Sequence, residues 1–106
     1  MRAEKRRKLE AAGWTVGSAE EFLELTPEEA TLVQIRLRLA RTIRELRKQH
    51  RLTQASVAER LGSSQSRVAK MEKADPSVSL DLMVRSAVAL GQSAEDVGRA
   101  ISRGVV

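Results

Sequence analysis

The sequence predicts an all-α protein, and three observations lead to this fold class. The 106 residues include one Trp, one Phe and no Tyr, and few clusters of β-branched residues, a composition that favours helices over a sheet. The stretch from Glu28 to Gln49 contains neither glycine nor proline. Four later segments each open on a Ser or Thr, residues that cap helix N-termini well. With 42% hydrophobic residues, the chain can bury the core of one domain.

The first 25 residues are predicted to form a helical extension. Residues 2–12 are a short, highly charged helix candidate that stops at Gly13. Ser18 and Glu21 have the spacing of a capping box, in which each side chain bonds the backbone N–H of the other residue. We therefore expect a second short helix to begin there and to continue through Leu25.

A long helix is predicted from Pro27 to about Gln49. Thr26 can cap it, Pro27 suits its first turn, and Glu29 completes a capping box. Apolar residues recur along it at steps of three and four, which is typical of a buried helix face. The residues of this stripe are Leu32, Ile35, Leu39, Ile43 and Leu46.

The same helix carries a second apolar stripe, rotated by about 120° from the first. It consists of Val33, Leu37 and Ala40. Because a surface helix usually buries one face, the second stripe needs a partner of its own. That partner is either residues 14–25 of the same chain or another protein.

Four shorter helices are predicted after the long one. Their expected caps are Thr53, Ser64, Ser79 and Ser93. The first three should end at Gly62, near Lys73 and at Gly91, and Asp75-Pro76 breaks the chain between the second and the third. Asp96 follows Ser93 at the spacing of a capping box and marks the start of the last helix.

Charge is unevenly distributed along the chain. Residues 1–17 carry a net charge of +3, residues 18–33 carry −5, and residues 34–106 carry +7. A basic body suits a polyanionic partner such as nucleic acid. The acidic segment is available to a different partner, although the simpler interpretation of any charge run is a solvated surface.

Several classes of function are disfavoured by what the chain lacks. It contains no cysteine, and His50 is its only histidine, so we expect no metal site, no cofactor and no enzymatic activity. With two aromatic residues, it is a poor candidate for stacking on single-stranded nucleic acid. No apolar run approaches the length of a membrane span, and we expect a cytoplasmic protein.

The segment from Leu52 to Glu72 predicts two short helices joined by a glycine turn. Small or apolar residues face inward from both helices: Val57, Ala58, Leu61, Val68 and Met71. This leaves Gln65, Ser66 and Lys70 on the outer face of the second helix, with Arg67 beside them. Glutamine can bond adenine, lysine can bond guanine, and serine can bond base edges or phosphate.

The starts of these two helices are candidate phosphate sites, because N-terminal N–H groups and the helix dipole favour an anion. The candidate residues are Thr53, Gln54, Ser63 and Ser64. The alternative is an ordinary helical hairpin with polar caps.

Residues 39–102 resemble the Xre/Cro/C1 family of five-helix, lambda-repressor-like DNA-binding domains. The matching residues are Leu52-Thr53-Gln54, Ala58, Leu61-Gly62, Ser64-Gln65-Ser66, Val68, Pro76-Ser77 and Ala89-Leu90-Gly91. The resemblance implies that Gln54 binds phosphate and supports Gln65. It also implies that Gln65, Ser66 and Lys70 read bases, with Arg67 on the backbone or a flanking base. A structural ion pair between Arg47 and Glu72 is expected as well.

The chain departs from this family in the family's fourth helix, which is predicted here between Ser79 and Gly91. Ser86 stands where a large aliphatic residue is usual, and Leu82 and Val88 stand where polar residues are usual. Since family dimers commonly use the last two helices, the resemblance makes Leu82, Val88, Val97 and Ile101 candidates for a dimer interface. The alternative is that residues 104–106 fold back over them.

The chain as a whole resembles HigA-type antitoxins of bacterial toxin–antitoxin operons. The resemblance implies a cytoplasmic, nucleoid-associated dimer that represses its own operon and neutralises a RelE/HigB-like, mRNA-cleaving toxin. Residues 39–103 would form the DNA-binding domain, and residues 1–38 the candidate toxin-binding region. The toxin-contact candidates are Trp14, Glu20, Glu21, Phe22, Leu23, Glu24, Leu25, Val33 and Leu37. The alternative function is a stand-alone repressor without a toxin partner.

Overall fold

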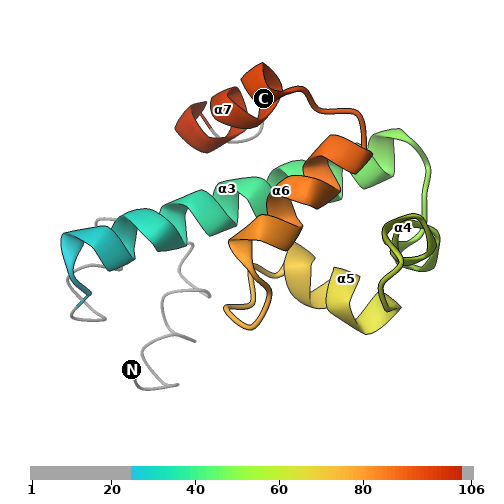
Figure 1. Cartoon of the computed structure of the whole chain (residues 1–106), viewed down its shortest axis with the longest axis horizontal. Helices are drawn as coiled ribbons and strands as arrows, with labels where there is room; N and C mark the ends of the chain where they lie inside the picture. The colour runs from blue at the N-terminus through green and yellow to red at the C-terminus, as the bar shows by residue number, and fades with distance from the viewer. Residues whose placement is uncertain (1–24, 104–106) are drawn as a thin grey trace. The chain divides into compact units, whose positions relative to one another are not determined.

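The computed structural model describes residues 25–103, and that part of the chain consists of five helices without a strand (Figure 1). They are α3 (Pro27–Gln49), α4 (Gln54–Leu61), α5 (Gln65–Glu72), α6 (Leu80–Ala89) and α7 (Ala94–Arg103). The predicted all-α fold with five helices is confirmed. The helical extension predicted for the first 24 residues lies outside the described residues.

The chain divides into two compact units, residues 1–34 and residues 35–106. Helix α3 begins in the first unit and continues through the second. The second unit contains the whole of α4 to α7, and therefore the entire helical pair predicted to bind DNA.

The helices begin where their capping residues predict. The Oγ atoms of Ser64 and Ser79 accept the backbone N–H groups of Arg67 and Leu82, each at 3.1 Å. At the start of α3, Thr26 and Glu29 bond reciprocally, at 3.0 and 3.1 Å. These bonds satisfy N–H groups that have no partner within a helix, which is why Ser and Thr at these positions set the boundaries.

The core of residues 35–106 is built on the inward side of α3. Leu39 and Ile43 are fully buried, and Ile35 and Leu46 pack partly against the same core. The other helices contribute Val57, Val68, Met71, Met83, Ala87, Leu90 and Val97. Leu32 departs from the prediction that the whole stripe is buried, since 42% of its surface is exposed.

Two arginines of α3 bond backbone carbonyls of distant segments. Arg38 Nη1 donates to the carbonyl oxygens of Ile101 and Ser102, at 2.7 and 3.0 Å, near the end of α7. Arg36 donates to the carbonyl oxygen of Val78, which precedes α6. The last carbonyls of a helix lack intrahelical partners and carry partial negative charge, so the Arg38 guanidinium stabilises α7 against α3.

Ser86 is fully buried in α6, at the position where the sequence analysis noted an unusual polar residue. Its hydroxyl donates to the carbonyl oxygen of Leu82 at 2.7 Å, which removes the cost of burying an unpaired polar group. The small side chain is therefore accommodated in the core without an unmade hydrogen bond.

Candidate nucleic-acid interface

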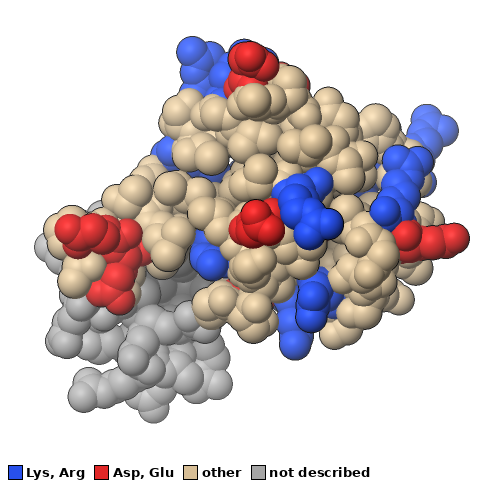
Figure 2. Space-filling model, viewed as in Figure 1, with Lys and Arg blue, Asp and Glu red and all other residues tan. Residues whose placement is uncertain are grey.

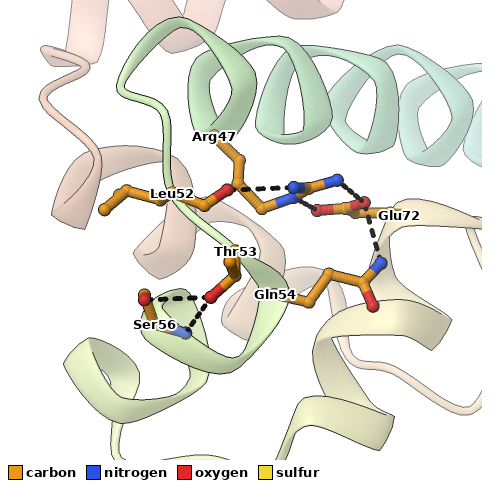
Figure 3. Close-up of polar contacts among 6 residues, drawn as sticks. All are labelled: Arg47, Leu52, Thr53, Gln54, Ser56 and Glu72. Atoms are coloured by element: carbon orange, nitrogen blue, oxygen red, sulfur yellow. Dashed lines mark hydrogen bonds and ion pairs between the residues drawn. The ribbon is translucent and has the colours of Figure 1, made fainter.

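Thr53 caps the N-terminus of α4, and its backbone is extended (φ −85°, ψ 164°). Its Oγ1 accepts the backbone N–H of Ser56 at 3.0 Å and lies 2.9 Å from the Ser56 hydroxyl oxygen (Figure 3). This cap fixes the first turn of α4. The remaining N–H groups of that turn point out of the helix end, in the arrangement that binds phosphate.

The turn between α4 and α5 depends on Gly62. Its backbone is left-handed (φ 61°, ψ 38°), a conformation that costs little for glycine and more for residues with a Cβ atom. A Cβ atom at this position would meet no other atom within 4 Å, so conformation rather than space requires the glycine. The N–H of Ser63 donates to the carbonyl oxygen of Ala58 at 2.8 Å, which closes the end of α4.

Helix α5 separates a buried side from an exposed side. Val68 and Met71 are fully buried against the core. The four residues predicted to contact bases or their flanks are all exposed: Gln65, Ser66, Arg67 and Lys70. Figure 2 shows basic side chains, with acidic ones among them, on the part of the surface formed by α4 and α5. The exposed side of α5 thus combines amide, hydroxyl and basic groups.

The predicted phosphate-contact residues lie at the starts of these helices. Thr53 and Ser64 are exposed caps, and Gln54 and Ser63 are half-buried. The hydroxyls of Thr53 and Ser64 accept N–H groups of their own helices. Ser64 thereby keeps its hydroxyl hydrogen as a donor, whereas the Thr53 hydroxyl also shares a hydrogen bond with the Ser56 hydroxyl. The structure places all four in the α4 start and the α4–α5 turn.

A hydrogen-bonded network joins α3, α4 and α5 at the C-terminal end of α5 (Figure 3). Arg47 Nε lies 2.6 Å from Glu72 Oε2, and Arg47 Nη2 lies 3.1 Å from Glu72 Oε1. Arg47 Nη1 also donates to the carbonyl oxygen of Leu52 at 3.0 Å. The ion pair expected between Arg47 and Glu72 is thus formed, and it is bidentate.

The ion pair is largely withdrawn from water, with side-chain exposures of 16% for Arg47 and 5% for Glu72. The hydrogen bond to Glu72 raises the pKa of Arg47, against the lowering effect of its burial. Arg47 is therefore charged at every physiological pH, and the pair connects α3 to the C-terminal end of α5.

Gln54 has a different partner from the one expected. Its Nε2 donates to Glu72 Oε1 at 3.1 Å, at the C-terminal end of α5 (Figure 3). The resemblance had implied support of Gln65. The sequence did not indicate the actual contact, because Gln54 and Glu72 are 18 residues apart and meet only once α4 and α5 have packed.

Most residues predicted to contact a toxin lie outside the described part of the chain. These are Trp14, Glu20, Glu21, Phe22, Leu23 and Glu24. Leu25, Val33 and Leu37 are described, and each is half-buried.

The four dimer candidates have different environments. Val88 is 52% exposed, whereas Leu82 and Ile101 are half-buried. Val97 is 8% exposed and belongs to the core, so its assignment to an interface is corrected: its side chain is already packed inside its own chain.

Leu82 and Val88 border an open groove of about 430 Å³ between α4 and α6. Leu61, Val84 and Ala89 complete its apolar lining, and Arg60 and Arg85 lie at its edge. The sequence analysis did not predict this groove, because it depends on how the end of α4 packs beside α6.

Residues 25–103 contain neither a metal site nor a membrane-spanning helix. No group of three or more His, Asp or Glu side chains there has an arrangement that could hold a metal ion. No helix there has the length and apolar character that crossing a membrane requires.

Comparison with known proteins identifies the family. No curated protein and no solved structure matches the chain significantly. A family described as a helix-turn-helix domain matches residues 22–96, which include α3 to α6 and the first turn of α7. The match covers more than half of the chain and includes the whole α4–turn–α5 arrangement. The chain belongs to the helix-turn-helix domain family, whose members act as DNA-binding regulators.

Proposed function

We propose that this protein is the antitoxin of a toxin–antitoxin operon: it represses the operon as a dimer and neutralises a RelE/HigB-like toxin. The observation that carries the DNA-binding part is the division of α5 into a buried and an exposed side. Val68 and Met71 fix the helix in the core, while Gln65, Ser66 and Lys70 project into solvent with groups that can bond base edges.

In the proposed complex, α5 lies in the major groove and the α4 start lies against the phosphate backbone. Gln65 reads adenine, Lys70 reads guanine, and Ser66 bonds a base edge or a phosphate. Thr53, Gln54, Ser63 and Ser64 donate to phosphates and set the position of the duplex. Arg67 contacts the backbone or a flanking base.

The base-reading proposal is tested with single alanine substitutions. Gln65→Ala and Lys70→Ala should each weaken operator binding by roughly 1–3 kcal/mol, if each forms a good base contact. Gel-shift titrations on operator and random-sequence duplexes measure this. The losses should be larger on the operator, because random DNA offers no correct base to lose. Equal losses on both duplexes would show that these residues contact only phosphate.

The dimer is proposed to use the groove between α4 and α6. Val88 is an exposed large apolar residue at this groove, which Leu82 also lines. In a twofold-symmetric pair, Val88 of each chain inserts into the groove of the other, since such an interface uses the same surface twice. A dimer then presents two α5 helices to half-sites about 34 Å apart.

The antitoxin part rests on the resemblance and on the acidic segment. Residues 18–33 contain five glutamates and no lysine or arginine, and two of these glutamates, Glu28 and Glu29, are exposed at the start of α3. A messenger-RNA-cleaving toxin must bind a polyanion and is therefore expected to be basic, so an acidic segment with apolar residues is complementary to it. Trp14, Phe22, Leu23 and Leu25 are proposed as apolar anchors, with Val33 and Leu37 beside them.

The toxin proposal is tested in the full chain by replacing Glu20, Glu21 and Glu24 with glutamine. The variant should fail to rescue cells that express the cognate toxin, because complementary charge is removed. Its operator affinity should hold or increase, because the change makes the chain more basic. Rescue at the level of the unsubstituted chain would remove this segment from the toxin interface.

The stand-alone repressor remains the second candidate, and the neighbouring reading frame distinguishes the two. A small, basic, RelE-like product encoded next to this gene supports the antitoxin. Pull-down of that product by the full chain, measured with and without the triple glutamine change, then tests the interaction directly.

A further inference from the structure

The outward side of α3 carries a row of basic residues that the helix-turn-helix site does not use. Arg41, Arg44 and Lys48 follow at steps of three and four, which places them within about 60° of arc on one side of the helix. Arg51 lies in the turn directly after α3. All four residues are exposed, and together they are called the basic ridge.

The other basic residues of α3 between positions 35 and 47 serve the fold. Arg36, Arg38 and Arg47 donate to Val78, to the end of α7 and to Glu72, respectively. Within residues 25–103, by contrast, the side chains of the ridge form no hydrogen bond or ion pair. Their positive charge is therefore available to a ligand.

The ridge leads directly to the start of α4. Arg51 has a left-handed backbone (φ 55°), and its N–H donates to the carbonyl oxygen of Lys48 at 3.0 Å. The N–H of Leu52 donates to the carbonyl oxygen of Arg47 at 2.9 Å. These bonds hold the turn in one conformation, and Thr53 caps α4 two residues after Arg51. An extended polyanion at the α4 start would therefore meet the ridge next.

The charge of this segment suits the density of a duplex backbone. From residue 34 to residue 54 the chain has seven Lys or Arg and one acidic residue, Glu45. Arg41 and Lys48 are about 10 Å apart along the helix axis. One DNA strand presents a phosphate about every 3.4 Å of duplex axis, so a ridge aligned with that axis would span about three of them.

We propose that the basic ridge binds the phosphate backbone of double-stranded DNA beside the segment read by α5. This inference rests on the proposed DNA-binding function and extends it to a surface outside the helix-turn-helix. The ridge adds affinity for any duplex and carries no information about sequence, because backbone contacts are the same at every base pair.

The test compares two variants of the full chain that lose the same charge. The ridge variant is Arg44→Gln, and the control is Arg103→Gln on α7, which is also exposed. Binding to a fluorescein-labelled, random-sequence duplex is titrated from 50 to 200 mM salt. The logarithm of the association constant falls as the logarithm of the salt concentration rises. In the ridge variant, the magnitude of this slope should decrease by about 0.9 for each lost phosphate contact. The control should keep the slope of the unsubstituted chain.

Three outcomes decide between the proposals. A smaller slope in the ridge variant alone, with an unchanged thermal midpoint by circular dichroism, supports the ridge as a DNA contact. Equal slopes in the two variants would overturn the ridge and leave the proposed function standing. If the unsubstituted chain binds neither random nor operator DNA, both proposals are refuted together.

Discussion

At the scale of single residues, Glu72 connects α5 to α3 and α4. Its carboxylate accepts two bonds from Arg47 of α3 and one from Gln54 of α4. Only 5% of its side chain is exposed, so the loss of either charged partner leaves an unpaired charge away from water. The resemblance predicted the ion pair, but the Gln54 contact follows from the packing of three helices.

The Arg47–Glu72 pair should show strong energetic coupling. Arg47→Met alone or Glu72→Met alone should each lower the free energy of unfolding by roughly 3 kcal/mol, because the remaining charge is buried without its partner. The double variant should lose less than the worse single variant. Urea unfolding of the three variants measures the coupling. If the single losses add to within about 0.5 kcal/mol, the two side chains do not interact energetically.

At the scale of helices, boundaries were predictable because they depend on residues close in sequence. Thr53, Ser64 and Ser79 each bond an N–H group three residues later, so their spacing in the sequence already contains the contact. Contacts between helices were harder to predict from the sequence. Leu32 belongs to the periodic stripe of α3 but is 42% exposed, and Val97 was expected at a surface but lies in the core. Periodicity identifies a face of a helix and does not show what covers it.

The start of α7 should make stability sensitive to acid. Asp96 accepts the backbone N–H of Ser93 at 2.9 Å, and this bond, together with the Ser93 hydroxyl and Arg99, lowers the pKa of Asp96 below its usual value of 3.8. A lowered folded-state pKa means that the stabilisation is present above about pH 4 and is lost as pH falls through the folded-state value.

Asp96→Asn should therefore reduce the difference between the thermal midpoints measured at pH 7 and pH 3. Circular dichroism melts of the unsubstituted chain, the Asn variant and Glu95→Gln provide the comparison. Glu95 is a matched control, because it lies in the same first turn and its side chain accepts no hydrogen bond within the described residues. An equal reduction in both variants would attribute the acid sensitivity to overall charge and not to the capping box.

At the scale of the whole molecule, charge is distributed unevenly over different segments of the chain. The acidic segment begins before α3, the basic ridge lies on the outward side of α3, and the exposed side of α5 belongs to a third element. The family match establishes the helix-turn-helix but does not distinguish an antitoxin from a stand-alone repressor. A toxin contact depends on a second protein, and no pattern within one chain contains that information.

Self-association is the testable property at this scale. Val88→Lys should convert a dimer into a monomer, because a charge would enter the apolar groove between α4 and α6. It should also weaken operator binding without altering the fold, since Val88 is 52% exposed. Sedimentation equilibrium measures the mass, with Ser102→Lys on α7 as the charge-matched control. A Val88→Lys chain that remains dimeric would place the interface elsewhere.

The network around Glu72 also bears on the thermodynamics of recognition. Because α5 is already held by α3 and α4 in the chain without DNA, its orientation is established during folding. Little conformational entropy then remains to be lost when the helix enters the groove, and more of the interaction energy appears as affinity. The expected calorimetric signature is a modest heat-capacity change, consistent with rigid association and unlike the large change that accompanies folding on binding.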